Sequence, residues 1–149
     1  MERKEEALIK RYQLEHLVPL VITIVSIYFM IIKFQNNFVY FVGLVISLIG
    51  LFIWWSAKIT LSENWSAGYG KPQIKNLVIN GIYSKISHPL YWGVNITLVG
   101  LCFIHLNSFL TIISIIIIIY FFYRMRVETS FLTKKLGKRY IDYRKTTWI

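Results

Sequence analysis

Residues 81–101, GIYSKISHPLYWGVNITLVGL, contain the change from a polar segment to an apolar run that indicates the fold class most clearly. Glycine, serine, lysine and histidine precede Pro89, and no charged residue follows it within the stretch. Proline is well tolerated in the first turn of a helix, and Ser87 has the side chain of a typical N-cap. The stretch therefore predicts a helix that begins at Pro89 and enters an apolar environment.

Apolar residues dominate the whole chain of 149 residues, of which 56% are hydrophobic and 17% aromatic. The charged residues gather mainly at 2–15, 58–85 and 124–145, with long uncharged runs between them. A soluble domain of this size would need more charge, spread evenly over its surface. The composition therefore predicts an all-α, polytopic membrane helical bundle that forms a single domain over residues 1–149.

Four apolar runs are each expected to form a transmembrane helix, at about residues 16–34, 38–57, 89–105 and 109–123. At 1.5 Å per residue the first is about 28 Å long, close to the thickness of the hydrocarbon core. The small residues Gly43, Ser47 and Gly50 of the second run are of a kind that supports close helix packing. The remaining segments are a loop at 58–88 and a tail at 124–149. We expect the tail to continue the fourth helix as an amphipathic helix that ends at Gly137.

The basic residues predict how the chain is oriented in the membrane. Lys and Arg precede the first span, occupy the 58–88 loop and follow the fourth span, whereas the connections QNN and LNS contain none. The positive-inside rule places all three basic segments, and both termini, on the cytoplasmic side. Anionic lipid head groups and this rule together account for the net charge of +10, so no nucleic-acid partner is expected.

The chain lacks the residue patterns of common hydrolytic or metal-dependent sites. His16, His88 and His105 are far apart in the sequence, and the predicted orientation places His105 on the opposite side of the membrane from His88. The single cysteine, Cys102, excludes an intrachain disulfide and makes a thiolate metal cluster implausible. No phosphate-binding glycine loop is present in the sequence. We therefore expect no metal site.

The polar residues at the cytoplasmic ends of the third and fourth spans have two interpretations. Tyr83, His88, Tyr91 and Trp92 are of the types that occupy a membrane interface. Glu128 is the only acidic residue between Glu63 and Asp142, and it either pairs with neighbouring arginines on the surface or belongs to a polar pocket. A carboxylate near the membrane face is costly unless it has such a role.

Three segments in order carry a resemblance to a known family: LSENWS, LVINGIYSKISHPLYWG and VETSFLTKKLGKRYIDYRK. Together they resemble the isoprenylcysteine carboxyl methyltransferase and phospholipid methyltransferase group of integral membrane enzymes. The pattern of that group is a Leu-Val-x-x-Gly-x-Tyr loop, Arg-His-Pro-x-Tyr-x-Gly entering a helix, Glu-Glu-x-x-Leu, and two closing tyrosines. The resemblance covers roughly residues 44–145 and implies S-adenosylmethionine as the cofactor.

The resemblance also implies which residues form the site. The cofactor-binding residues it implies are Leu77, Val78, Gly81, Tyr83, His88, Tyr91, Gly93 and Glu128. Tyr140 and Tyr143 match the closing tyrosines, which are expected to pack the tail over the site. Methyl transfer is an in-line displacement that chiefly requires positioning of the reactants. Arg124 or Arg126 would orient a carboxylate acceptor, whereas an amine or thiol acceptor would need His88 as a base.

The sequence departs from the family pattern at two positions, with Ser87 in place of Arg and Thr129 in place of the second Glu. The first departure bears on the acceptor, and the second lowers the polarity of the cofactor site. We predict a membrane methyltransferase that acts on a lipophilic small molecule or lipid, with O-methylation of a carboxylate or hydroxyl favoured. The alternatives are a phospholipid N-methyltransferase and a non-catalytic membrane scaffold or binding protein. The sequence does not reveal an oligomeric state.

Overall fold

The computed structural model describes Ile24, Tyr28 and residues 37–61, 77–105 and 109–148. Contacts divide the chain into two compact units, and the larger one, Asn36–Trp65 with Ile74–Ile149, contains every helix named below. In the smaller unit, Met1–Gln35 with Ser66–Gln73, only Ile24 and Tyr28 are described, and both are exposed. The rest of the predicted first span, 16–34, lies outside the described residues, as does the 62–76 part of the predicted loop.

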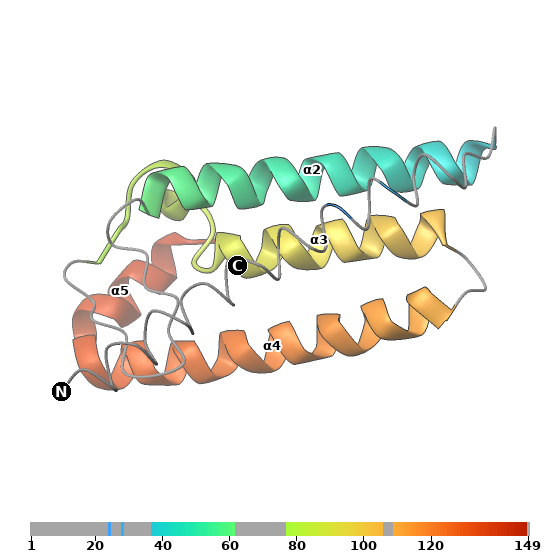
Figure 1. Ribbon diagram of the computed structural model, residues 1–149. Helices are drawn as coiled ribbons and strands as arrows, with labels where there is room; N and C mark the ends of the chain where they lie inside the picture. The colour runs from blue at the N-terminus through green and yellow to red at the C-terminus, as the bar shows by residue number, and fades with distance from the viewer. Residues whose placement is uncertain (1–23, 25–27, 29–36, 62–76, 106–108, 149) are drawn as a thin grey trace, which may run out of the picture. The chain divides into compact units, whose positions relative to one another are not determined.

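The described residues of the larger unit are helical and contain no strand, which confirms the all-α class for this part of the chain. The elements in chain order are α2 (Phe38–Leu61), η2 (Gly81–Ser84), α3 (Pro89–Ile104), α4 (Phe109–Leu136) and α5 (Lys138–Thr146). Helix α3 lies between α2 and α4, and the short α5 lies at the end of the bundle where α4 terminates (Figure 1).

The helix boundaries follow the apolar runs closely. Helix α2 begins at the predicted Phe38 and continues to Leu61 rather than Ala57. Helix α3 begins at the predicted Pro89 and ends at Ile104, with His105 as its C-cap. Helix α4 extends through the predicted span and into the tail, as expected, and stops before Gly137, whose φ of +56° ends the helix.

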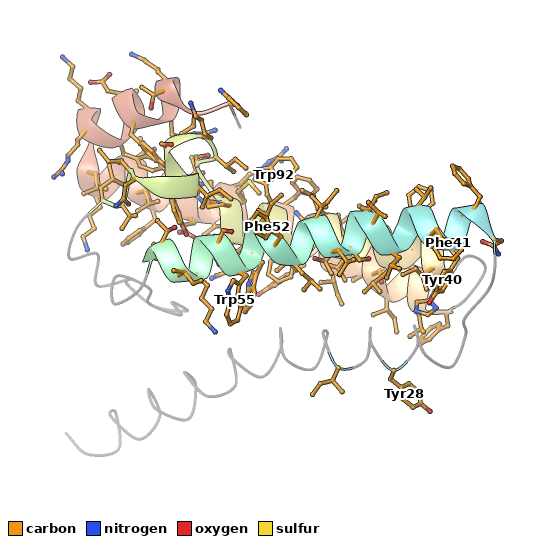
Figure 2. The ribbon with its side chains drawn as sticks, turned by 90° about the horizontal axis from the view of Figure 1, so that it is seen from above. Tyr28, Tyr40, Phe41, Phe52, Trp55 and Trp92 are labelled. Atoms are coloured by element: carbon orange, nitrogen blue, oxygen red, sulfur yellow. The ribbon has the colours of Figure 1, made fainter. Side chains whose placement is uncertain are left out.

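The N-cap of α3 is His88, so the expectation that Ser87 would cap this helix is wrong. The His88 side chain makes no capping hydrogen bond, because its ring is directed to other helices instead. At the start of α2 the cap is conventional: the backbone N–H of Tyr40 donates to Asn37 Oδ1 at 2.8 Å. Tyr40 lies at this end of α2 in Figure 2.

Two described helices are long and apolar enough to cross a membrane, α2 with 24 residues and α4 with 28. Helix α3 is a shorter apolar helix of 16 residues. Large apolar side chains of α2, among them Phe41, Phe52 and Trp55, are exposed (Figure 2). Such a surface is normal against lipid and unusual in a soluble monomer. The four-span topology and the cytoplasmic side of the termini stay predictions.

Helices α2 and α3 approach each other closely, because small residues line the contact. The glycines at this contact are Gly43 and Gly50 of α2 and Gly93 and Gly100 of α3. A Cβ atom on Gly93 would lie 2.6 Å from the Trp54 backbone nitrogen, so only glycine fits there. The Ser47 hydroxyl also donates to the Thr97 carbonyl at 3.3 Å. The expectation that Gly43, Ser47 and Gly50 support helix packing is therefore confirmed within the chain.

We predict that Gly50→Ala destabilises the protein by about 1–3 kcal/mol, the usual cost of overpacking. The added methyl group would lie 2.7 Å from the Gly93 carbonyl oxygen and against the Thr97 backbone, which cannot move without separating the helices. The measurement is the free energy of unfolding in mixed micelles at increasing denaturing detergent. Leu48→Ala, on an exposed position of α2, is the matched control and should change stability little. Equal effects of both substitutions would contradict the close packing.

Candidate active site

His88 lies buried at the start of α3, with only 4% of its surface exposed. Its Nε2 atom is 2.8 Å from the Thr129 hydroxyl of α4 and 3.1 Å from the Tyr140 hydroxyl of α5. Thr129 also lies within hydrogen-bonding reach of Tyr140. One ring nitrogen therefore joins three segments that are distant in the sequence.

The burial of His88 determines its charge. Burial, and to a smaller extent the positive charge of Arg144, lower the pKa of His88 to about 4. The imidazole is consequently neutral at pH 7 and carries one ring N–H. A neutral Nε2 in contact with two hydroxyl groups accepts a hydrogen bond from one of them or donates its own N–H.

Tyr91 and Glu128 form the second polar contact, next to His88. The Tyr91 hydroxyl donates to Glu128 Oε2 at 2.6 Å, and its ring centroid lies 5.9 Å from that of His88. Phe121 packs on the other side of Tyr91, with ring centroids 5.8 Å apart. The charge of Arg124 acts on Glu128 as well. Glu128 therefore belongs to a partly buried polar cluster, and Arg124 accompanies it there.

The tail contacts the segment before α3, and one of the two closing tyrosines makes part of this contact. The Tyr143 hydroxyl donates to the Tyr83 carbonyl at 2.7 Å, and burial raises the pKa of Tyr143 to about 12. The Trp148 backbone N–H donates to the Lys85 carbonyl at 2.8 Å. The Lys85 ammonium in turn lies 5.4 Å from the centre of the Trp148 ring. These contacts attach the end of the chain to the η2 segment.

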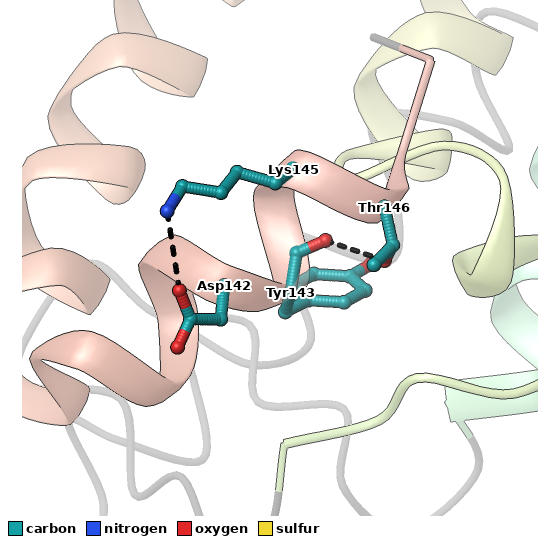
Figure 3. Close-up of polar contacts among 4 residues, drawn as sticks. All are labelled: Asp142, Tyr143, Lys145 and Thr146. Carbon is teal, nitrogen blue, oxygen red and sulfur yellow. Dashed lines mark hydrogen bonds and ion pairs between the residues drawn. The ribbon is translucent and has the colours of Figure 1, made fainter.

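Helix α5 has a buried face and a solvated face. Tyr140 and Tyr143 are buried with Leu132 in a small core, around which Leu77 and Phe131 pack. On the other face Lys145 pairs with Asp142 at 3.3 Å, an exposed contact that contributes little to stability (Figure 3). The Thr146 hydroxyl donates to the Tyr143 carbonyl at 2.7 Å and helps to close the last turn (Figure 3).

Several of the residues implied by the resemblance lie together in the structure. His88, Tyr91 and Glu128 form the two contacts described above. Tyr83 is buried within the electrostatic influence of Glu128, and burial raises the pKa of its phenol. Leu77 packs on the core under α5. We refer to His88, Tyr91, Glu128, Thr129 and Tyr140 as the polar cluster.

Four other predicted site residues lie apart from these contacts. Gly93 faces Trp54 of α2, where its lack of a side chain permits close packing. Gly81 has a φ of +55° and begins η2 beside Thr60, so its role in the structure is that of a turn residue. Val78 is half-buried before η2, and Arg126 is exposed on α4. Their assignment to the site stays a prediction.

The sequence analysis missed Asn95, a polar residue inside the bundle, and assigned Trp92 to the membrane interface. Asn95 is only 3% exposed, and neither its amide nitrogen nor its amide oxygen has a hydrogen-bond partner among the described residues. The indole nitrogen of Trp92 is in the same situation within this part of the chain. An amide in the middle of a predicted apolar span was the available signal, since such residues are costly in a membrane.

We predict that Tyr143→Phe lowers the free energy of unfolding by about 1–3 kcal/mol, because it leaves the Tyr83 carbonyl without its donor. The free energy is measured by denaturing-detergent titration. Tyr123→Phe is the matched control, because Tyr123 is 63% exposed and loses the same hydroxyl group. A control variant that is destabilised as much as Tyr143→Phe would count against the role of the tail contact.

We also predict that stability falls when the pH is lowered from 7 to 5. The pKa of His88 is about 4 in the folded protein and 6.5 in the unfolded chain, so the unfolded state binds more protons in this window. The stabilisation is complete above pH 6.5 and is lost toward pH 4. It decreases by about 2 kcal/mol between pH 7 and pH 5. Unfolding free energies at each pH test this, and His88→Gln should flatten the dependence. An unchanged slope in that variant would show that His88 is not its source.

Comparison with known proteins gives one match. A family model for phospholipid methyltransferases matches residues 38–139, which is more than half of the chain. The matched residues extend from the start of α2 into α5 and include four of the five members of the polar cluster. No curated protein and no solved structure matches the chain.

Proposed function

We propose that this chain, which belongs to the phospholipid methyltransferase family, transfers a methyl group from S-adenosylmethionine to a lipophilic acceptor in the membrane. The family and the apolar helices α2 and α4 make the chain a membrane methyltransferase. The observation that carries the proposal for the site is the polar cluster, where His88, Tyr91 and Glu128 meet at adjoining ends of α3 and α4. The alternative of a non-catalytic scaffold has no comparable observation in its favour.

The side chains of the polar cluster fit a cationic methyl donor. His88 is neutral at pH 7 and does not repel a cation. Burial raises the pKa of Glu128, and a bound cation would favour the ionised carboxylate, which attracts the donor in turn. Tyr91 contacts one oxygen of that carboxylate, and a carboxylate has a second oxygen that can accept from a ribose hydroxyl or an ammonium group. The neighbouring rings of Tyr91 and Phe121 suit a sulfonium, because aromatic faces attract cations.

The cofactor, when bound, supplies a methyl group activated by its positively charged sulfur. The chain's contribution is then to position the reactants and to exclude water, which is where most of the acceleration of an in-line displacement originates. Glu128 and Tyr91 would hold the donor. The neutral His88, which lies beside Tyr91, would offer the donor a further hydrogen bond. The tail would exclude water, since Tyr140 and Tyr143 bury His88 and the η2 segment.

The family description supports a phospholipid head-group amine as the acceptor. A head-group ammonium becomes a nucleophile only after it loses a proton, and it then attacks the methyl group as the bond from methyl to sulfur breaks. A histidine with a pKa of about 4 is a weak base, so this proton would pass to solvent rather than to His88, which differs from the role expected for His88 from the sequence. A second candidate is O-methylation of a carboxylate or hydroxyl. Arg124 supports it, because this guanidinium acts on Glu128 at the polar cluster and could orient an anionic acceptor.

We predict that S-adenosylhomocysteine binds the detergent-purified protein with one-to-one stoichiometry, measured by titration calorimetry. Glu128→Gln and His88→Gln should each weaken binding about tenfold or more, the effect of removing a charged or buried hydrogen bond. Lys134→Ala, an exposed position of the same helix, is the matched control and should bind normally. Saturable binding that all variants retain would place the cofactor elsewhere, and no binding by the wild-type protein would refute the methyltransferase proposal.

The two acceptor classes are separated by a transfer assay with methyl-labelled S-adenosylmethionine in bilayers. Label in phosphatidylethanolamine supports the amine acceptor, whereas label in a long-chain carboxylic acid supports O-methylation. Arg124→Gln is informative in both cases. It should abolish transfer to a carboxylate and leave transfer to an amine largely intact.

A further inference from the structure

Asn95 has a buried amide group, and no contact among the described residues explains why it is buried. Both polar atoms of its amide lack a hydrogen-bond partner within the described ranges, although the residue is only 3% exposed. Leaving such a group without a partner costs about 1–3 kcal/mol. Native proteins satisfy nearly all buried polar atoms, so an exception indicates a ligand, an ion or ordered water.

The position of Asn95 on α3 relates it to the polar cluster. Trp92 precedes it by three residues and Tyr91 by four, so all three lie on one face of the helix. This face meets α4, since the Trp92 ring packs edge-on against Phe122 with centroids 5.7 Å apart. The opposite face, with Gly93, packs on α2. Asn95 is therefore about one turn, or roughly 6 Å, deeper in the bundle than Tyr91.

We propose that Asn95 and Trp92 bind the uncharged acyl carbonyl oxygens of a lipid acceptor whose head group lies at the polar cluster. The inference rests on the proposed function and names the part of the lipid that the chain recognises. The two side chains offer three N–H donors, two from the amide and one from the indole. Neither carries a charge, so they suit a neutral ester carbonyl better than a phosphate or carboxylate, which would need a buried countercharge.

The spacing along α3 agrees with the dimensions of a glycerolipid. Asn95 follows His88 by seven residues, which corresponds to roughly 10 Å along the helix axis. A head-group amine is separated from the acyl carbonyls of the same phospholipid by several covalent bonds, a comparable length. A lipid that enters between α3 and α4 can therefore place its reacting group beside Glu128 and its ester groups beside Asn95.

The test compares two lipids that differ only in the proposed recognition group. Phosphatidylethanolamine with two ester-linked chains and its ether-linked analogue share the head group and chain length, but the second lacks carbonyl oxygens. Their apparent Kd values for the purified protein are measured by native mass spectrometry. We expect the wild-type protein to prefer the ester lipid about tenfold, the effect of one to two hydrogen bonds. Asn95→Leu should abolish the preference, and Trp92→Phe should reduce it.

A matched control variant tests whether the lost preference is specific to Asn95. Thr97→Val changes a buried polar residue of α3 whose hydroxyl bonds to Gly93 within the helix, and it should keep the ester preference. Equal affinity of the wild-type protein for both lipids, or a preference that survives in Asn95→Leu, overturns the inference. It would indicate that water alone satisfies the amide.

The S-adenosylhomocysteine titration separates this inference from the proposed function. Asn95→Leu should bind S-adenosylhomocysteine as the wild-type protein does, which also shows that the variant is folded. Loss of the ester preference with unchanged cofactor binding supports the inference. A wild-type protein that prefers the ester lipid but binds no S-adenosylhomocysteine would refute the methyltransferase proposal and leave the lipid contact established.

Discussion

The contact of His88 Nε2 with Thr129 and Tyr140 is the interaction on which the arrangement at this end of the bundle depends. It connects the start of α3 to α4 and α5, and the Tyr91–Glu128 hydrogen bond lies directly beside it. Burial and the positive charge of Arg144 both disfavour a protonated imidazole at this position. Both the packing of the tail and the polarity of the site therefore depend on His88 being neutral.

The two faces of α3 differ in composition and contact different helices. The face with Gly93 and Gly100 has almost no side-chain volume, so α2 can pack against its backbone. The face with Tyr91, Trp92 and Asn95 is aromatic and polar, and it meets the rings of α4. Rigid packing on the first face restricts how far the second can move, which suits a reaction that depends on positioning.

The sequence was sufficient to predict most of the helix boundaries and to group His88, Tyr91 and Glu128. Pro89 marks the start of α3, because its φ is restricted to helical values. Gly137 marks the end of α4, because it adopts a positive φ. His88, Tyr91 and Glu128 could be grouped because three motifs occur in the expected order. Helix α2 extended past its predicted end, where Lys58 follows the apolar run without breaking the helix.

The remaining features depend on which helix faces meet, and one sequence does not contain that information. From the sequence, Thr129 was expected to lower the polarity of the cofactor site, yet its hydroxyl contacts His88. Gly93 was expected to belong to the cofactor site, yet it faces Trp54 of α2. Ser87 has the usual side chain of an N-cap, but the N-cap is His88, whose ring contacts α4 and α5.

The attachment of the tail also has a consequence for the order in which the molecule is made. Tyr140 follows His88 by 52 residues, and the whole of α4 is synthesised between them. During translation α2 and α3 can pair through their glycines while the ring of His88 still lacks both hydroxyl partners. The polar cluster is completed only when α5 leaves the ribosome and folds back onto η2. The contact between α2 and α3 can therefore form before the polar cluster does.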